Sequence, residues 1–420
     1  MPDMPPVDAA APVAEAERLP ELDVLRGVAL LGVLLANFVG VASAGVLATG
    51  TQLAALPSAR FDAVTDFLVH WLVADKANTL FACLFGLGFY LQMQRGAGRA
   101  GFERRYRRRL GWLLVFGVLN QLLLWQWDIL HLYALCGFLL LSMRGWRTRS
   151  LVAFGLLAAL YSDKLQEWIA GAVGWTPIPD SLYADPAVLE RQAIVVSGSY
   201  RQVVAMQWSM TWAEWIAGGM LAAWIVYALG RFALGAAIGR SGLAADIRAH
   251  LPRLRTLACW ALPSGVLAAL VVRLLGDGLW QPLGQNDALV HLAQSLRAPT
   301  ALLLAAGYAS AMVVALHGAR GGRWLLPFAA VGRMALTNYL AQGFLYAFVL
   351  YGIGPGLGLA GRIGSTSIVA TSLAFFAGQV VFSHLWLAHF HFGPMEWLWR
   401  TLTSARRPRF RRMRALPATT

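Results

Sequence analysis

Residues 22–43 read LDVLRGVALLGVLLANFVGVAS. This stretch has the length of one helical crossing of a lipid bilayer, about 20 residues, and its only charged residues, Asp23 and Arg26, stand near its beginning. Asn37 follows deep in the apolar run. At a rise of about 1.5 Å per residue, a helix that starts at the membrane surface would place Asn37 near the middle of the bilayer.

The rest of the chain repeats this pattern. Of its 420 residues, 58% are hydrophobic and 13% are charged, which excludes an ordinary soluble enzyme, a secreted disulfide scaffold and a disordered chain. The composition predicts an all-α, polytopic integral membrane helix bundle of about ten transmembrane helices. The apolar runs that we assign to them lie near 22–43, 65–93, 108–126, 128–143, 150–172, 210–238, 256–276, 298–318, 324–352 and 366–390.

The basic residues behind the net charge of +14 gather in alternate connections between these runs, and one such cluster, after the sixth run, begins with Arg231 and Arg240. This distribution follows membrane topology, so it predicts two cytoplasmic termini and excludes nucleic acid as a partner. We expect a disordered cytoplasmic tail at 1–20, one membrane domain at 21–405 and a basic cytoplasmic tail at 406–420. The domain would divide into 21–240, with a large outer loop at 174–207, and 241–405.

Ionisable and amide side chains inside apolar runs mark candidate sites, since they are costly to place in a membrane. Asp23 and Arg26 are three residues apart and face the same side of a helix, and Gly27 would let another group approach the backbone. Arg26 can bind a phosphate or carboxylate while Asp23 holds its guanidinium in place. Equally open is an ion pair that only anchors the helix end.

A second polar group lies at the start of the fourth run, where Asp128, His131 and Tyr133 begin a helix. The spacing lets Asp128 orient the His131 imidazole, which can then act as a general base toward a hydroxyl or amine on the outer side. The alternative is that Asp128 caps the helix and His131 lies in the interface.

Two further groups occur near the C-terminus. Polar residues in one segment would form two stripes on a helix, either as the wall of a cofactor pocket in the cytoplasmic half or as interhelical hydrogen bonds: Arg333, Thr337, Asn338, Tyr339 and Gln342. A second segment has the features of a structural cap on the bundle, with Glu396 and Arg400 four residues apart: Gly393, Pro394, Glu396, Trp397 and Arg400.

No metal site is expected. The chain has three cysteines and no C-x-x-C motif, and His384, His389 and His391 lack the spacing and the carboxylate of a zinc-protease motif.

Five blocks resemble one known family: LDVLRGVALLGVLLAN at 22–37, LFACLFGLGF at 80–89, DILHLYALCG at 128–137, GRMALTNYLAQ at 332–342 and FGPMEWLWR at 392–400. In this order, and across nearly the whole chain, they resemble the YeiB-like bacterial membrane proteins, whose C-terminal part is the domain of unknown function 418 (DUF418). Gly86, in the second block, is then expected to support the site.

That family is grouped with transmembrane acyltransferases, among them the acyltransferase-3 enzymes and the heparan glucosaminide N-acetyltransferases. The resemblance implies a bacterial inner-membrane protein that takes acyl-CoA, such as acetyl-CoA, from the cytoplasm and acylates a sugar or alcohol, extracytoplasmic or lipid-linked. Arg26 matches the arginine of the acyltransferase-3 motif. Where that motif has histidine, this chain has Asn37, so Asn37 would donate to the acyl carbonyl and Asp128 or His131 would be the base.

The sequence is also compatible with two other functions. The same intramembrane polar groups would serve a transporter or exporter of a small hydrophobic or anionic metabolite. A non-catalytic lipid-binding protein would instead have an apolar groove without converging polar groups. Membrane lipids are partners in every case, and a homo-oligomer is compatible with each.

Overall fold

The structure is a computed structural model that describes residues 19–98, 101–174, 178–277, 279, 286–318, 320–404 and 407–412. Within these residues the chain is helical and forms no strand, apart from two isolated β-bridges. The predicted all-α class is therefore confirmed. The tail expected at 1–20 lies outside the described residues as far as Arg18, and so do 413–420.

The α-helices run in chain order as follows: α1 (Pro20–Ala42), α2 (Gly50–Ala54), α3 (Ala59–Leu72), α4 (Lys76–Gly96), α5 (Phe102–Leu123), α6 (Leu130–Ser142), α7 (Thr148–Val173), α8 (Asp185–Ser197), α9 (Tyr200–Met210), α10 (Met220–Arg240), α11 (Ile247–Gly276), α12 (Asp287–Ser295), α13 (Arg297–Leu316), α14 (Gly321–Leu325), α15 (Pro327–Arg333), α16 (Ala335–Leu350), α17 (Ser365–His389) and α18 (Pro394–Ser404). Short 3-10 helices (Met143–Gly145 and Asp180–Tyr183) and one π-helix (Thr211–Ala217) lie between them.

In the described part of the chain, six helical stretches are long and apolar enough to cross a membrane: Pro20–Ala42, Ala59–Gly96, Met220–Arg240, Ile247–Gly276, Arg297–Leu316 and Ser365–His389. Shorter apolar helices are Leu130–Gly145, Thr148–Ala159 and Ala335–Leu350. The long apolar helices agree with the membrane bundle that the composition predicts, whereas the count of ten crossings stays a prediction.

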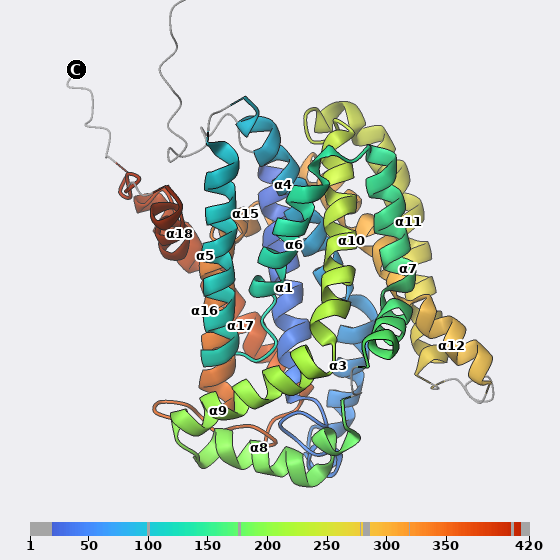
Figure 1. Cartoon of the computed structure of the whole chain (residues 1–420), viewed down its shortest axis with the longest axis vertical. Helices are drawn as coiled ribbons and strands as arrows, with labels where there is room; N and C mark the ends of the chain where they lie inside the picture. The colour runs from blue at the N-terminus through green and yellow to red at the C-terminus, as the bar shows by residue number, and fades with distance from the viewer. Residues whose placement is uncertain are drawn as a thin grey trace, which may run out of the picture.

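Most of the helices stand side by side, and α1 runs through the middle of the bundle (Figure 1). It packs against α4, α15 and α17. We call the end where α1 begins and α4 ends the arginine-rich end, and the opposite end, covered by α8 and α9, the cap end (Figure 1). The predicted outer loop at 174–207 thus contains α8 and most of α9, which lie across the bundle (Figure 1).

Glycines set two of the closest helix contacts. A Cβ atom on Gly86 of α4 would overlap the backbone carbonyl of Phe232 in α10, and one on Gly235 of α10 would overlap the carbonyl of Cys83. Such contacts let backbones approach more closely than any side chain allows, as is common between membrane helices. Gly86 therefore joins α4 to α10.

The run expected at 65–93 as one span is divided between α3 and α4. Asp75, at the break, has φ 60°, the only positive φ of a described non-glycine residue. The buried Lys76 begins α4, and its Nζ donates to the carbonyl of His70 at 2.9 Å. This bond satisfies a carbonyl that the end of α3 leaves without a helical partner.

The run expected at 210–238 is also divided. Residues 211–217 form the π-helix, and α10 begins only at Met220, because Gly219 has φ 72° and cannot continue a right-handed helix. The apolar helix is thus shorter than expected, and the turn before it belongs to the cap end.

Candidate functional site

Asp128 lies at the end of the α5–α6 hairpin and is fully buried. One carboxylate oxygen, Oδ1, accepts from Asn120 Nδ2 at 2.8 Å. The other, Oδ2, accepts from the backbone N–H groups of Leu130 at 2.7 Å and His131 at 3.1 Å, the first free donors of α6. Gln121 Oε1 accepts from the Asp128 backbone N–H at 3.0 Å. The carboxylate therefore caps α6 and is held in one orientation.

The same carboxylate contacts the imidazole of His131. Nδ1 lies 3.4 Å from Asp128 Oδ2, and the ring meets Trp215 edge to face with centroids 4.9 Å apart. A proton on Nδ1, shared with Asp128, leaves the lone pair on Nε2, which has no hydrogen bond to the described residues. This is the arrangement of a general base positioned by a carboxylate. Asp128 thus both caps α6 and orients the imidazole of His131.

Two buried polar atoms next to this pair have no hydrogen-bond partner among the described residues. One is the indole Nε1 of Trp215, the ring that packs on His131, and the other is Asn120 Oδ1. Buried donors and acceptors of membrane and soluble proteins are normally satisfied, by protein, water or ligand. Trp215 Nε1 and Asn120 Oδ1 are therefore a donor and an acceptor that the described residues leave unsatisfied beside the pair.

Glu214, which belongs to none of the polar groups predicted from the sequence, lies in the same region. It is fully buried on the π-helix; its Oε2 accepts from Trp127 Nε1 and its Oε1 from the Tyr183 hydroxyl, each at 2.8 Å. π-Helical turns are rare and frequent at functional sites. The sequence signal that could have identified Glu214 is that it is the only acidic residue in the apolar run 210–238.

Glu214 precedes the spanning helix α10, and burial raises its pKa. Hydrogen bonds from Trp127 and Tyr183 and the charge of Arg191 oppose this rise without cancelling it. Between the ordinary glutamate pKa and this raised value, the folded protein holds a proton that the unfolded chain has lost, so we expect stability to fall as pH rises through this window. Tryptophan fluorescence and thermal unfolding, followed against pH, should show this transition in the wild type and not in Glu214→Gln.

The exposed Glu190 provides the control for this experiment. Glu190→Gln should titrate as the wild type does. A transition that persists unchanged in Glu214→Gln would show that another group is responsible.

Tyr133, Tyr339 and Asn37 have different surroundings. Tyr133 packs edge to face on Phe85 and Phe232 inside the core. The Tyr339 hydroxyl accepts from the backbone N–H of Ile129 at 3.2 Å and so touches the α5–α6 hairpin, while its place on a cofactor wall stays a prediction. Asn37 Nδ2 is buried and has no hydrogen-bond partner in the described chain.

At the arginine-rich end, Arg26 Nη1 lies 3.1 Å from Asp23 Oδ1. Arg109 lies in the first part of α5, and its guanidinium carbon lies 3.8 Å from the centroid of the Trp399 ring. Trp399 Nε1 donates to the Arg109 carbonyl at 2.8 Å. Helices α5 and α18 thus meet at Arg109 and Trp399.

Gly27 is occupied by protein rather than open to a ligand. A Cβ on Gly27 would overlap the carbonyl of Phe328 in α15, and one on Gly332 would overlap the carbonyl of Asp23. Gly27 therefore lets α15 approach α1, and Gly332 brings the end of α15, where Arg333 follows, against Asp23.

The prediction that Arg333 and Thr337 lie on one helix is wrong. Helix α15 ends at Arg333 and α16 begins at Ala335. The reason is Glu396 of α18, whose Oε1 accepts from the backbone N–H groups of Leu336 at 2.7 Å and Thr337 at 3.0 Å. Its Oε2 accepts from Thr337 Oγ1 at 2.6 Å. A carboxylate from a distant helix thus replaces two helical carbonyls and caps α16.

The remaining residues of α18 support this cap. A Cβ on Gly393 would overlap Glu396 Oε2, and Pro394 is the first residue of α18. Arg400 lies 4.4 Å from the Phe392 ring centroid, and Trp397 Nε1 donates to the Pro408 carbonyl at 3.1 Å.

Asn338 and Gln342 lie in a network between α16 and α17. Asn338 Nδ2 donates to Ser383 Oγ at 3.0 Å, and Gln342 Nε2 to Gln379 Oε1 at 3.3 Å. Gln379 Nε2 in turn donates to the Asn338 carbonyl at 2.8 Å. Both residues thus make interhelical hydrogen bonds, the alternative to a pocket wall that the sequence left open.

Arg231 corrects another expectation, because it lies inside α10 with 0% of its surface exposed and not in a connection. Its Nε donates to Thr79 Oγ1 at 2.9 Å and its Nη1 to the Tyr227 carbonyl at 2.9 Å. The guanidinium carbon lies 3.3 Å from the Tyr227 ring centroid, and Nη2 has no partner in the described part of the chain. The apolar residues that continue after Arg231 were the missed signal.

Comparisons with known proteins identify the family of this chain. Residues 238–406 match the family described as protein of unknown function (DUF418). The chain is 30% identical to the uncharacterized protein YxaH of Bacillus subtilis, over 93% of this chain and 96% of that protein. It is also 30% identical to the uncharacterized protein YeiB of Escherichia coli, over 92% of this chain and 96% of that protein. The chain therefore belongs to the YeiB-like family of membrane proteins with a C-terminal DUF418 region.

Proposed function

We propose that this protein is an acyltransferase of the bacterial cytoplasmic membrane that moves an acyl group from acyl-CoA to a hydroxyl or amine of an extracytoplasmic or lipid-linked acceptor. The observation that carries this proposal is the Asp128–His131 pair, with Nε2 free of hydrogen bonds to the described residues. The partnerless Trp215 Nε1 beside it offers a donor for an oxygen of the reacting group.

In the proposed reaction, His131 Nε2 removes the proton of the acceptor hydroxyl as its oxygen bonds to the thioester carbonyl carbon. The carbon–sulfur bond then breaks, and the thiolate takes the proton from the imidazolium, so that free CoA leaves. Asp128 stabilises the imidazolium that forms between the two steps. Trp215 Nε1 would donate to the carbonyl oxygen as its negative charge develops.

The donor would enter at the arginine-rich end, which this proposal assigns to the cytoplasm together with both termini. Arg26 and Arg109 would bind the phosphates of CoA, because a guanidinium group donates charge-assisted hydrogen bonds to phosphate oxygens. Arg333 lies at the same end. Gly27 contributes no part of this donor site, since the backbone of α15 fills the space beside it.

Arg26→Ala is expected to weaken acyl-CoA binding by about tenfold or more, the effect of losing one charge-assisted contact to phosphate. Calorimetry on the full-length protein in detergent measures the effect with acetyl-CoA. The exposed Arg323 of α14 provides the matched control, so Arg323→Ala should bind as the wild type does. Equal affinity in Arg26→Ala and wild type would contradict the donor site.

A buried arginine beside a divided helix favours transport of an anionic metabolite as the second candidate, since such elements form many transporter sites. Arg231 hydrogen-bonds to Thr79 in the first turn of α4, next to the break at Asp75. Flux of an anion into protein-containing vesicles without any acyl donor would favour this function. Donor-dependent acylation without flux would favour acyl transfer.

A further inference from the structure

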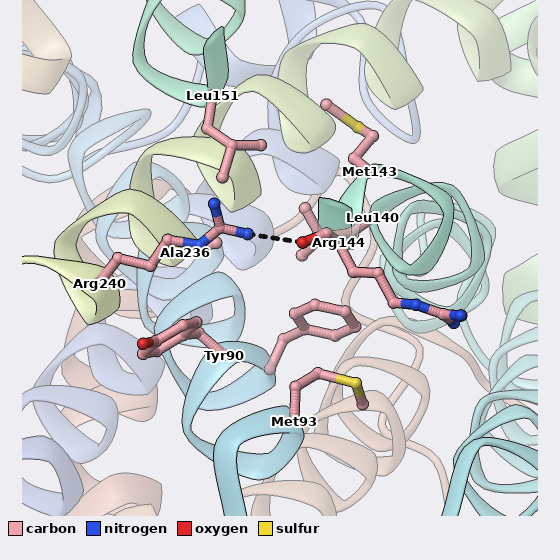
Figure 2. Close-up of a pocket in the computed structure, with 9 residues that line it drawn as sticks. Tyr90, Met93, Leu140, Met143, Arg144, Leu151, Ala236 and Arg240 are labelled. Carbon is pink, nitrogen blue, oxygen red and sulfur yellow. Dashed lines mark hydrogen bonds between the residues drawn. The ribbon is translucent and has the colours of Figure 1, made fainter. Parts of the chain in front are cut away.

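A pocket of about 90 Å³ lies between α4, α6, α7 and α10 at the arginine-rich end. Figure 2 shows the residues that line it. Its walls are mostly apolar, with Phe89 and Met93 from α4, Leu140 from α6 and Leu151 from α7, and its charged residues are Arg144 and Arg240. None of these residues takes part in the reaction proposed above.

The charge beside the pocket is unbalanced. Arg240 Nη2 donates to the Arg144 carbonyl at 2.8 Å, the bond drawn as a dashed line in Figure 2, and so holds the turn after α6. The Arg144 side chain is 53% exposed and lies 2.6 Å from Glu103 Oε2. Glu103 also accepts from Arg107, at 2.6 Å through Oε1. The single carboxylate of Glu103 therefore pairs with two guanidinium groups, and the guanidinium of Arg240 is a third positive charge.

The size of the pocket limits what it can hold. An apolar cavity of about 150 Å³ accommodates benzene, so this smaller space takes a few methylene groups and not a nucleotide. Apolar walls with cations at the edge match a molecule whose aliphatic chain meets an anionic head. At the end of a membrane bundle, phospholipids are the molecules of this kind at the highest local concentration, and basic pockets between helices bind anionic headgroups.

We propose that this pocket binds an anionic phospholipid of the adjacent leaflet. The headgroup phosphate lies against the exposed Arg144, with the charge of Arg240 at the pocket wall adding to the attraction, and part of one acyl chain lies between Phe89, Leu140 and Leu151. The remainder of the chain continues into the bilayer along the bundle. This site is independent of the proposed acyl transfer, because lipid binding needs neither an acyl donor nor His131.

The test compares phosphatidylglycerol with phosphatidylcholine on the full-length protein, by native mass spectrometry and by thermal shift in detergent. We expect at least a tenfold preference for phosphatidylglycerol in the wild type, reduced about tenfold in Arg144→Gln. Arg144 is half exposed, so this variant should fold. Arg323→Gln, which removes an exposed charge elsewhere, is the matched control and should keep the preference.

A second variant, Leu151→Phe, fills the pocket and keeps its charge. It should lower the affinity for phosphatidylglycerol but leave binding of a short-chain analogue with the same headgroup less affected. Equal binding of both lipids by the wild type would overturn the proposal. So would competition by inorganic phosphate as strong as that by the lipid, or displacement of the lipid by acetyl-CoA, since either would assign the cations to another ligand.

Discussion

Replacing His131 by glutamine is expected to lower the rate of acyl transfer by about 10²- to 10⁴-fold, the contribution of a positioned general base. Glutamine keeps a polar side chain of similar reach, but its amide cannot take up the acceptor proton. Donor binding should stay within about twofold of the wild type, because the proposed phosphate contacts are made by other residues. Single-turnover transfer from radiolabelled acetyl-CoA to membrane acceptors measures the rate, and calorimetry measures donor binding.

His384 provides the matched control for this variant. It is exposed on α17, where its Nδ1 lies 3.0 Å from the Val380 carbonyl, and His384→Gln should transfer acyl groups at the wild-type rate. An active His131→Gln protein would remove His131 from the chemistry. Loss of transfer and of donor binding together would indicate a damaged fold and not a missing base.

Gly86→Ala is expected to destabilise the folded protein by about 3 kcal/mol or more, while Gly88→Ala should be neutral or stabilising by up to about 1 kcal/mol. A Cβ on Gly86 overlaps the Phe232 carbonyl, whereas one on Gly88 meets nothing within 4 Å. The first change must push α4 and α10 apart by on the order of 1 Å, in a closely packed interior. The second only replaces a poor helix former by the best one.

Thermal unfolding of both variants in the same detergent measures this difference, and size-exclusion chromatography shows how much folded protein each yields. Because the two glycines lie two residues apart on the same helix, we expect any effect of a substitution on membrane insertion or expression to be the same in both variants. Equal stability of the two would contradict the close contact between α4 and α10.

The features that the sequence predicted well are local ones. The apolar run at 22–43 corresponds to α1 at Pro20–Ala42, since length and hydropathy alone decide such a helix. The contacts of Asp23 with Arg26 and of Asp128 with His131 join residues three apart, so helical geometry places them together.

Contacts between distant segments were not predictable in this way. The carboxylate that divides α15 from α16 belongs to Glu396, some 60 residues further along, and Trp127 meets Glu214 across 87 residues. No periodicity within either segment contains this information. The polar residues around Thr337 therefore suggested one amphipathic helix, although tertiary capping stabilises two.

Arg231 was misplaced for a different reason. Basic residues near the end of an apolar run usually mark its boundary, and Arg240 does so here at the end of α10. For Arg231 the boundary rule fails, because hydrogen bonds to Thr79 and Tyr227 and the Tyr227 ring make burial of the guanidinium possible.

The buried Arg231 also has a consequence for biogenesis. An arginine at the centre of a helix opposes its insertion from the translocon by about 2.5–3.5 kcal/mol, so α10 enters the lipid less readily than its apolar residues suggest. The hydroxyl that accepts from Arg231 is on Thr79, 152 residues earlier in the chain. During synthesis α4 has therefore left the ribosome before α10 emerges. Thr79 is therefore synthesised before Arg231, and α4 provides the hydrogen-bond acceptor that favours insertion of α10.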